Sequence, residues 1–276
     1  MRVARTRYTE LARRLGLLPS QGRALPLDSH GGREFIGCPP SDGEVHYVWS
    51  FLYWGSVMEP DIRGRLRQAW GLCERHAWAF LSVEAAFRPH FLHASALVYE
   101  DLMGRARNAF RLMGPWKAGR LRHALREQEP CIMCDIGYGP HSRGAASSPL
   151  LKRGRDVASL RGFAEATRPW WGAAVCGICS GEGSPVRCRR HLRDELLDGV
   201  GARQVEDAGH LVWRITEHVV RFSSSFRWEL RGTDTQEDRA ALISAVGWCS
   251  GWRPLLAIVG SGLPRSSSGP SSYCAT

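Results

Sequence analysis

Apolar residues recur every three or four positions through much of this 276-residue chain, and this spacing predicts a mostly α-helical protein. The longest such pattern runs from Leu92 to Met113 in alternating steps of four and three, and it is closed by Gly114 and Pro115. It predicts an amphipathic helix that packs against a core rather than a ligand-binding stripe. Shorter patterns predict further helices over residues 44–58, 60–70, 73–87, 116–129, 191–197, 211–222 and 235–246.

The segments between these helices carry further predictions. Residues 226–230 alternate and are short enough for a strand or an extended link. Asp207 is expected to cap the helix over 211–222, and residues 234–237 have the spacing of a capping box. Residues 141–168 combine six Arg or Lys with Gly, Ser and Pro, which predicts a basic surface insertion that is partly disordered.

Composition supports a folded, globular chain. Hydrophobic residues make up 43% of the sequence and include 11 Trp, which is enough apolar material for a substantial core. The formal net charge of +10 is carried almost entirely by Arg, because Lys117 and Lys152 are the only lysines. These basic residues are spread over most of the chain, so nucleic-acid binding is an alternative rather than the first expectation.

The nine cysteines are expected to be metal ligands before they are disulfides. The first 20 residues carry several Arg but no uninterrupted apolar stretch, which argues against a secretory signal peptide. No window approaches the roughly 18 apolar residues of a membrane span, so no membrane association is expected. A reduced, cytoplasmic setting favours metal or redox sites for closely spaced cysteines.

The cysteines form a repeated pattern that predicts two modules. Each module has a Cys-x-x-Cys type pair followed by a Cys-x-x-His pair. Module one, residues 33–127, contains Cys38 with a serine in the second position, Ser41, and then Cys73 and His76; module two, residues 128–258, contains Cys131 and Cys134, then Cys188 and His191, with the basic insertion at 141–168. Residues 1–32 are expected to form a flexible arm and residues 259–276 a disordered tail. We therefore predict two helical modules, each with a zinc-knuckle-like Cys/His loop, arising from an internal repeat.

Zinc is the metal that this pattern favours. It prefers four tetrahedral N or S ligands, and a two-residue spacer lets both members of a pair reach one ion from a tight turn or a first helical turn. The second module offers three such pairs within 61 residues, since Cys176 and Cys179 add to those already named. This density predicts at least one zinc site in the second module.

Two pairings remain open for that site. By analogy with module one, Cys131 and Cys134 would join Cys188 and His191, and this arrangement is slightly preferred. By local spacing, Cys176 and Cys179 would join the same Cys188 and His191 in a compact Cys₃His site. Six ligands are too many for one zinc ion, so the spare pair is either left unligated or captures a second metal with Cys73 and His76.

Two enzymatic alternatives follow from the same residues. Module one alone supplies three ligands, Cys38, Cys73 and His76, and three protein ligands with an open position are typical of catalytic zinc. Loss of a fourth ligand by drift explains the same three residues without catalysis. Cys176 and Cys179 resemble a redox dithiol, but no βαβ pattern surrounds them.

Several short motifs resemble those of an uncharacterised family of prokaryotic proteins that repeat a Cys-Pro-x-Cys … Gly-Phe-Cys-x-x-His module twice. The motifs are Ile36-Gly37-Cys38-Pro39, Phe51-Leu52-Tyr53, Glu59-Pro60-Asp61-Ile62-Arg63, Gly71 to Trp78, Val98 to Leu102 and Phe226 to Glu229. The resemblance covers about residues 33–250 and implies a cytoplasmic, mostly helical, zinc-binding protein without implying an activity. Ser41 and the Cys176/Cys179 pair depart from the pattern of the family.

The function expected from these observations is that of a binding or adaptor protein whose metal stabilises its fold. The Arg-rich insertion at 141–168 is the expected contact surface for a partner protein. A zinc- or dithiol-dependent enzyme and a nucleic-acid-binding protein remain the alternatives.

Overall fold

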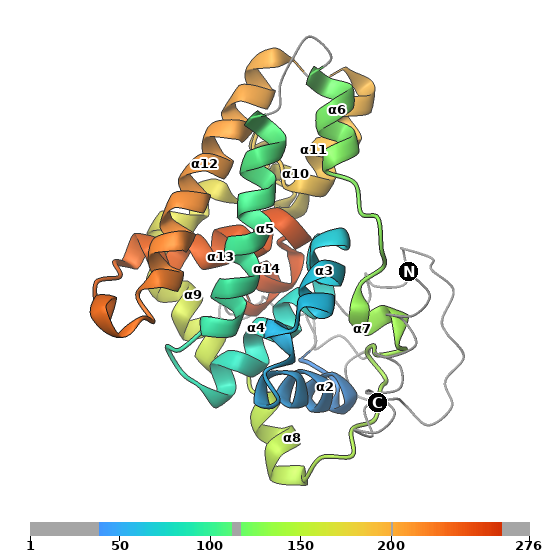
Figure 1. Cartoon of the computed structure of the whole chain (residues 1–276), viewed down its shortest axis with the longest axis vertical. Helices are drawn as coiled ribbons and strands as arrows, with labels where there is room; N and C mark the ends of the chain where they lie inside the picture. The colour runs from blue at the N-terminus through green and yellow to red at the C-terminus, as the bar shows by residue number, and fades with distance from the viewer. Residues whose placement is uncertain (1–38, 112–116, 200, 261–276) are drawn as a thin grey trace, which may run out of the picture.

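The computed structural model describes residues 39–111, 117–199 and 201–260, and every regular element in these ranges is helical (Figure 1). The predicted mostly α fold is therefore confirmed. The α-helices are α2 (Asp42–Tyr53), α3 (Pro60–Gln68), α4 (Glu74–Phe87), α5 (His93–Arg111), α6 (Lys117–Ala124), α7 (Ile132–Asp135), α8 (Ser148–Gly154), α9 (Ala158–Trp171), α10 (Gly177–Ser180), α11 (Arg189–Asp198), α12 (Ala202–Ser224), α13 (Gln236–Ser250) and α14 (Arg253–Gly260). Short 3-10 turns form η1 (Ser56–Met58), η2 (Gly172–Ala174) and η3 (Trp228–Leu230). The predicted arm at 1–32 lies outside the described residues, as does the predicted tail beyond Gly260.

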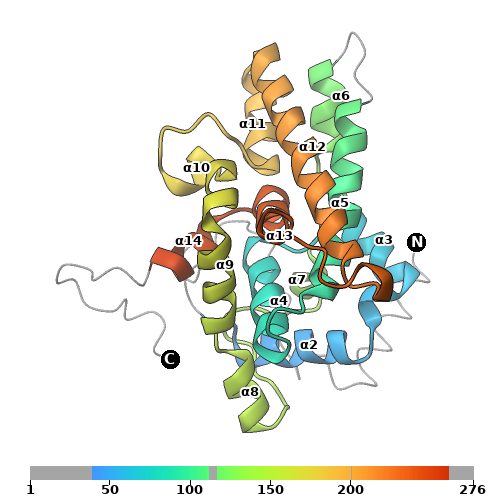
Figure 2. The same cartoon turned by 90° about the vertical axis from the view of Figure 1, so that its left-hand side faces the viewer.

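Helix α13 is the centre of the core because it is buried on every side. All residues from Ala240 to Ser250 are buried, which is typical of a helix in the interior rather than on the surface. Helices α5, α9 and α12 pack around it (Figure 2). Gly247 is needed here because a Cβ atom at this position would lie 2.3 Å from the buried ring of Trp252.

Helices α5 and α12 lie side by side along the long axis of the molecule (Figure 1). The predicted apolar seam of α5, including Met103 and Phe110, is buried against the apolar face of α12, including Val212 and Val219. Each large apolar side chain buried in this way contributes about 1.5–3 kcal/mol. Both helices also pack against α13.

The predicted disorder in the basic insertion is wrong. Residues 141–168 contain helix α8 and most of α9, and α9 packs against α4 and α13. The apolar face of α9 carries Leu160, Phe163, Ala164, Thr167 and Trp171, all buried. This three- and four-residue spacing outweighs the local Arg and Gly content, so one face of α9 belongs to the core, while most of the stretch lies at the surface.

Three smaller expectations also differ from the structure. Residues 228–230 form a 3-10 turn instead of a strand or extended link, and no strand occurs in the described ranges. Helix α12 begins at Ala202 after Gly201, so Asp207 lies inside the helix and does not cap it. The capping box of α13 is formed by Thr235 and Asp238, one residue later than the predicted register.

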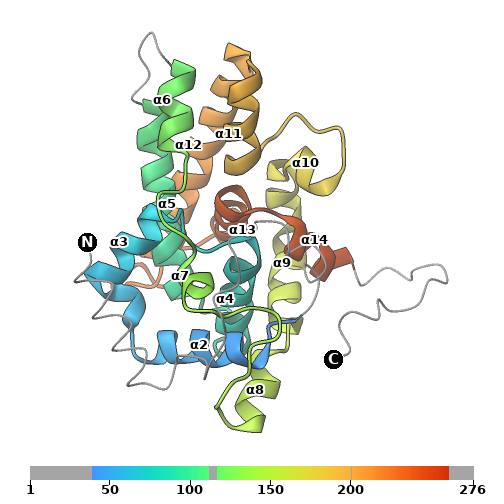
Figure 3. The same cartoon turned by 90° about the vertical axis from the view of Figure 1, so that its right-hand side faces the viewer.

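The short helix α7 lies against helices α3 and α4, which come much earlier in the chain. It follows a long segment that returns from α6 along α3 and ends beside α4 (Figure 3). An ion pair of 2.8 Å between Arg65 of α3 and Asp135 of α7 holds it there. A cysteine pair that lies between α6 and α8 in the sequence is thereby placed against the start of α4.

Candidate metal centres

Two compact groups of potential metal ligands lie in the structure. Site 1 consists of Cys73, His76, Cys131 and Cys134, and site 2 consists of Cys176, Cys179, Cys188 and His191. Within each group the four ligand atoms all lie within 4.8 Å of one another. Each group therefore could hold one metal ion.

The two residues of each pair in site 1 point the same way because both pairs begin a helix. Cys73 is the N-cap of α4 and His76 follows in the first turn. Cys131 is likewise the N-cap of α7, and Cys134 lies in its only turn. An N-cap and the residue three positions later lie on one side of the first turn, so each pair presents two ligand atoms together.

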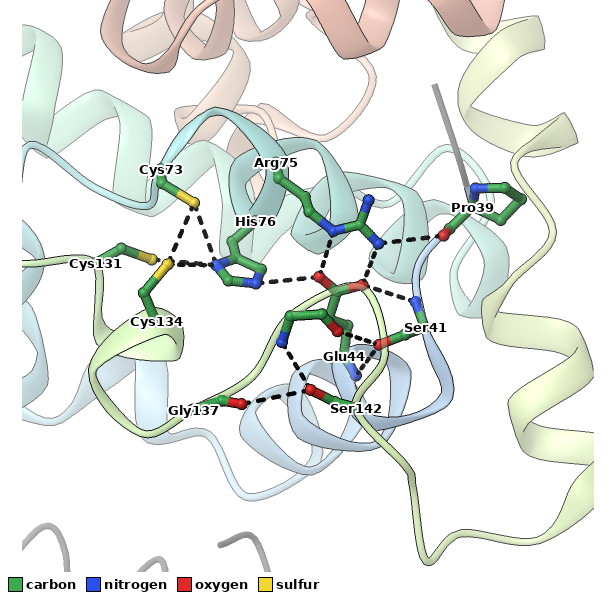
Figure 4. Close-up of polar contacts among 11 residues, drawn as sticks. Pro39, Ser41, Glu44, Cys73, Arg75, His76, Cys131, Cys134, Gly137 and Ser142 are labelled. Atoms are coloured by element: carbon green, nitrogen blue, oxygen red, sulfur yellow. Dashed lines mark hydrogen bonds and ion pairs between the residues drawn. The ribbon is translucent and has the colours of Figure 1, made fainter. Parts of the chain in front are cut away.

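The distances in site 1 centre on the ring of His76. Its Nδ1 lies 3.2 Å from the Sγ of Cys73, 3.3 Å from that of Cys134 and 3.5 Å from that of Cys131. The Sγ atoms of Cys73 and Cys134 are 3.7 Å apart, although these residues are separated by 61 positions (Figure 4). A disulfide needs about 2.05 Å between sulfurs, so these are free thiols in contact.

A buried carboxylate stands behind the histidine of site 1. An Oε1 of Glu44, on α2, lies 3.1 Å from Nε2 of His76, while the opposite ring nitrogen faces the three sulfurs (Figure 4). The Glu44 side chain has no exposed surface and also accepts two hydrogen bonds of 2.7 Å from the guanidinium of Arg75. Burial alone would raise the pKa of Glu44, but His76 and Arg75 outweigh it and lower the pKa to about 2. A carboxylate in this position fixes the ring orientation of a metal-binding histidine.

Site 2 repeats the same local construction with both pairs close in sequence. Cys176 is the N-cap of α10, and Cys188 is the N-cap of α11, with His191 in its first turn. The loop between them folds back so that the Gly177 N–H donates to the carbonyl of Val186 over 3.0 Å. Gly177 permits this close approach, because a Cβ there would lie 2.1 Å from the carbonyl oxygen of Ser184.

The distances in site 2 match those in site 1. The Nδ1 of His191 lies 3.2 Å from the Sγ of Cys176, 3.3 Å from that of Cys188 and 3.6 Å from that of Cys179. The sulfurs of Cys179 and Cys188 are 3.9 Å apart. Within the described residues no carboxylate contacts the other ring nitrogen of His191, which is a difference from site 1.

Both sites have the size of a tetrahedral zinc site. Zn–S bonds of about 2.3 Å and Zn–N bonds of about 2.0 Å place two sulfurs roughly 3.8 Å apart and a sulfur and a nitrogen roughly 3.5 Å apart. The observed S–S distances of 3.7 and 3.9 Å and the N–S distances of 3.2–3.6 Å agree with these values. The donor set, three thiols and one imidazole, is a common structural zinc set.

The thiols of each cluster share their protons unequally. Hydrogen bonds from the thiols of Cys179 and Cys188 lower the pKa of Cys176. The same hydrogen bond between Cys179 and Cys176 raises the pKa of Cys179 to about 12. Burial raises the pKa of Cys131, but hydrogen bonds from Cys134 and Cys73 and the charge of His76 outweigh it and lower that pKa. One thiol per cluster therefore loses its proton readily, and the thiolate is the form that binds metal.

The slightly preferred pairing of Cys131 and Cys134 with Cys188 and His191 is wrong. The structure instead pairs them with Cys73 and His76, because α7 returns to the start of α4. The alternative pairing by local spacing matches site 2, and the spare pair joins the Cys-x-x-His of the first module. Binding of metal by these eight residues stays a prediction, as do the module boundaries.

Two of the three residues considered for an open site in module one, Cys73 and His76, lie instead with Cys131 and Cys134. The third, Cys38, lies outside the described residues. Ser41, which stands where a second cysteine was expected, is the N-cap of α2 and forms a capping box with Glu44. Its hydroxyl donates a 2.8 Å hydrogen bond to the carbonyl of Gly139, in the loop that follows Cys134.

The sequence reasoning missed Glu44 and Arg75 as parts of site 1. The Ser41-x-x-Glu44 spacing is that of a capping box, and it predicts that Glu44 lies in the first turn of a helix. Nothing local, however, places that turn behind His76, since the contact joins α2 to α4.

Comparison with protein-family models, with curated proteins and with solved structures finds no match to this chain. The family resemblance carried by the Cys-x-x-His motifs therefore stays a prediction. None of the helices in the described ranges has the length and apolar character needed to cross a membrane.

Proposed function

We propose that the protein binds two zinc ions, one in site 1 and one in site 2, and that both ions stabilise its fold. The observation that carries this proposal is the convergence of three thiols and one imidazole within 4.8 Å at each of two places. We further propose that the protein acts in the cytoplasm as a binding or adaptor protein, since the free thiols of both sites suit a reducing compartment.

A structural role fits the ligand count better than a catalytic one. Catalytic zinc keeps a position open for water or substrate, whereas four protein ligands fill a tetrahedral site. Cys176, Cys188 and His76 are almost fully buried, whereas Cys134 of site 1 is exposed, so the case for a structural role rests on the ligand count. The grouping also disfavours a redox dithiol of Cys176 and Cys179, since Cys188 and His191 complete a four-ligand set with them.

Metal analysis of the untagged native protein tests this proposal. Elemental analysis is expected to find two zinc ions per chain in the wild type and one in each of Cys131→Ser and Cys176→Ser. Cys249→Ala is the matched control, because Cys249 is buried but belongs to neither site, and it should keep both ions. A wild-type protein without metal, or with Cys176 and Cys179 cycling between dithiol and disulfide, would overturn the structural-zinc proposal.

The Arg-rich stretch expected to contact a partner is partly engaged in contacts within the protein itself. Three basic residues of the 141–168 stretch already serve the fold: Arg153 donates to the carbonyls of Ala86 and Phe87, Arg155 pairs with Asp42, and Arg161 donates to the carbonyl of Ile258. Their guanidinium groups are therefore largely committed to intramolecular contacts.

A different stretch offers a stronger positive surface and favours nucleic-acid binding as a second candidate function. Residues 102–126 contain no Asp or Glu, and their basic residues are Arg105, Arg107, Arg111, Lys117, Arg120, Arg122 and Arg126. We define the basic face as four of these, which are exposed and form no ion pair within the described residues: Arg111, Arg120, Arg122 and Arg126. Arg120 and Arg122 lie on α6 and Arg126 follows its end, and a polyanion that neutralises this run of positive charge would be favoured.

Fluorescence anisotropy with a labelled DNA duplex tests this second function. The wild type is expected to bind with an affinity that falls steeply with salt, and Arg122→Glu/Arg126→Glu should weaken binding and flatten the salt slope by about 0.9 per lost phosphate contact. Lys152→Glu/Arg231→Glu is the control, because it makes the same charge change at two exposed positions outside the basic face. Equal loss in both variants would reduce the effect to net charge.

A further inference from the structure

Arg189 occupies a position that connects the two candidate metal sites. It follows the site 2 ligand Cys188 directly and is the first residue of α11, yet only 2% of it is exposed. Its guanidinium donates to the carbonyl of Cys249 over 2.9 Å, to the carbonyl of Leu125 over 2.6 Å and to the carboxylate of Glu127 over 2.6 Å. A buried charge with this many partners is fixed in position, since losing any partner leaves it unsatisfied.

The first connection leads to the Cys131 side of site 1. Leu125 and Glu127 lie in the segment between α6 and α7, and Cys131 follows Glu127 by four residues. A second arginine of α11, Arg193, holds the other carboxylate oxygen of Glu127 at 2.5 Å. This segment is thus attached to α11, whose first turn carries the ligands Cys188 and His191.

The second connection leads to the Cys73 side of site 1. The guanidinium of Arg189 lies 5.1 Å from the centre of the Trp70 ring, a cation–π distance. Trp70 has a φ of 57° and Gly71 a φ of 88°, so a bulky side chain is held in the left-handed region just before Cys73. Such a conformation persists only where the surroundings enforce it, and the ring is completely buried between its neighbours.

We infer that Arg189 is a positioning residue for site 1 and that it couples metal binding at the two sites. Metal at site 2 fixes the first turn of α11 and with it Arg189, which holds the segments leading to Cys131 and Cys73 in the geometry of site 1. Occupancy of one site then raises the affinity of the other, and the effect is reciprocal because both are binding equilibria. This inference rests on the proposed two-zinc function.

Zinc affinity of site 1, measured by competition with a chromophoric chelator, tests the coupling. In Cys176→Ser/Cys179→Ser, which removes site 2, we expect the affinity of site 1 to fall by about 10-fold, within the usual range of such couplings. Arg189→Met should weaken site 1 to a similar extent although all eight ligands remain. Adding Arg189→Met to the site 2 variant should then cause little further loss, because the connection is already broken.

Two controls separate coupling from general destabilisation. Thr216→Val removes a buried hydroxyl that bonds the carbonyls of Met103 and Val212, far from both clusters in the sequence, and should leave the affinity of site 1 unchanged. Glu127→Gln removes the charge partner of Arg189 at a partly exposed position. It should also lower the zinc affinity of site 1, and it provides the test if Arg189→Met does not fold.

The outcomes are distinguishable from those of the proposed function. A wild type that binds no zinc overturns the two-zinc proposal itself. Two zinc ions per chain, with equal affinity of site 1 in the wild type, the site 2 variant and Glu127→Gln, overturn the coupling and leave the proposed function standing. The absorption of thiolate-bound Co²⁺ in site 1 should keep its shape in Glu127→Gln, since the ligands do not change.

Discussion

The two candidate metal sites use the same ligands but differ in how the chain assembles them. The four ligands of site 2 lie at most 15 positions apart in the sequence, whereas site 1 joins residues as far as 61 positions apart. Site 1 also has a buried carboxylate and an arginine behind its histidine. The geometry within each ligand pair therefore depends only on one turn of the chain. Which two pairs share an ion depends on how the whole chain folds.

This difference predicts unequal contributions to stability. A metal in site 1 closes a loop of 55 positions between His76 and Cys131, and one in site 2 closes a loop of 9 between Cys179 and Cys188. Loop-closure entropy alone makes the longer connection worth about 1.6 kcal/mol more.

Loss of site 1 should therefore destabilise the protein more than any other change. Cys131→Ser should lower the free energy of unfolding by several kcal/mol, and by about 1.6 kcal/mol more than Cys176→Ser, because the longer loop is released. Urea denaturation of both variants, with Cys249→Ala alongside, measures this difference. Equal destabilisation by the two serine variants would remove the energetic distinction between the sites.

Glu44→Gln is expected to act on site 1 alone. The neutral amide no longer stabilises the ring orientation and charge of His76, so the zinc affinity of site 1 should fall by about 10- to 100-fold. Site 2 has no such carboxylate, so adding Glu44→Gln to Cys131→Ser, where site 1 is already lost, should leave the affinity of site 2 unchanged. A further loss at site 2 in that double variant would assign the effect to the fold rather than to the contact with His76.

Ser41→Ala tests whether Ser41 serves as the N-cap of α2 or takes the place of a metal ligand. The variant should cost about 1 kcal/mol, because the α2 N-cap and its contact with Gly139 are removed. The zinc content should remain two per chain, since Ser41 supplies no ligand to site 1. Thermal melts and elemental analysis of the same samples give both readings, and a drop in zinc content would contradict the capping role.

The smallest effect lies away from both sites, at Asp238 in the capping box of α13. Burial favours its protonated form, but hydrogen bonds from Thr235 and His218 outweigh burial and lower its pKa below the ordinary value of 3.8. The stability it contributes is thus complete above pH 3.8 and is lost as the pH falls through the lower folded value.

Melting curves between pH 3 and 6 check the contribution of Asp238. Asp238→Asn should melt below the wild type at pH 6, and the gap should close toward pH 3 as the wild-type carboxylate becomes protonated. Because Asp238 touches neither cluster, the gap at pH 6 should be the same in Cys176→Ser. A gap that disappears when site 2 is removed would mean that the cap depends on metal.

Local features of the fold were predictable from the sequence because they depend on neighbours in the chain. The α5 pattern, the turn before Cys73 and the placement of Cys-x-x-His pairs at helix starts all follow from spacing and capping. The α9 stretch was mistaken for a partly disordered insertion because its Arg and Gly content hid a buried face of the same spacing.

The amino-acid sequence alone was enough to predict the helical class, to pick out the Cys and His pairs and to indicate the metal chemistry they favour. The packing of the helices was needed to show that Cys131 and Cys134 meet Cys73 and His76, that Glu44 lies behind the histidine and that Arg189 contacts the segment leading to Cys131. This division arises because a two-residue spacer orients two ligands within one turn. The other two ligands of site 1 lie far along the chain, and the packing of α3, α4 and α7 brings them to the first pair.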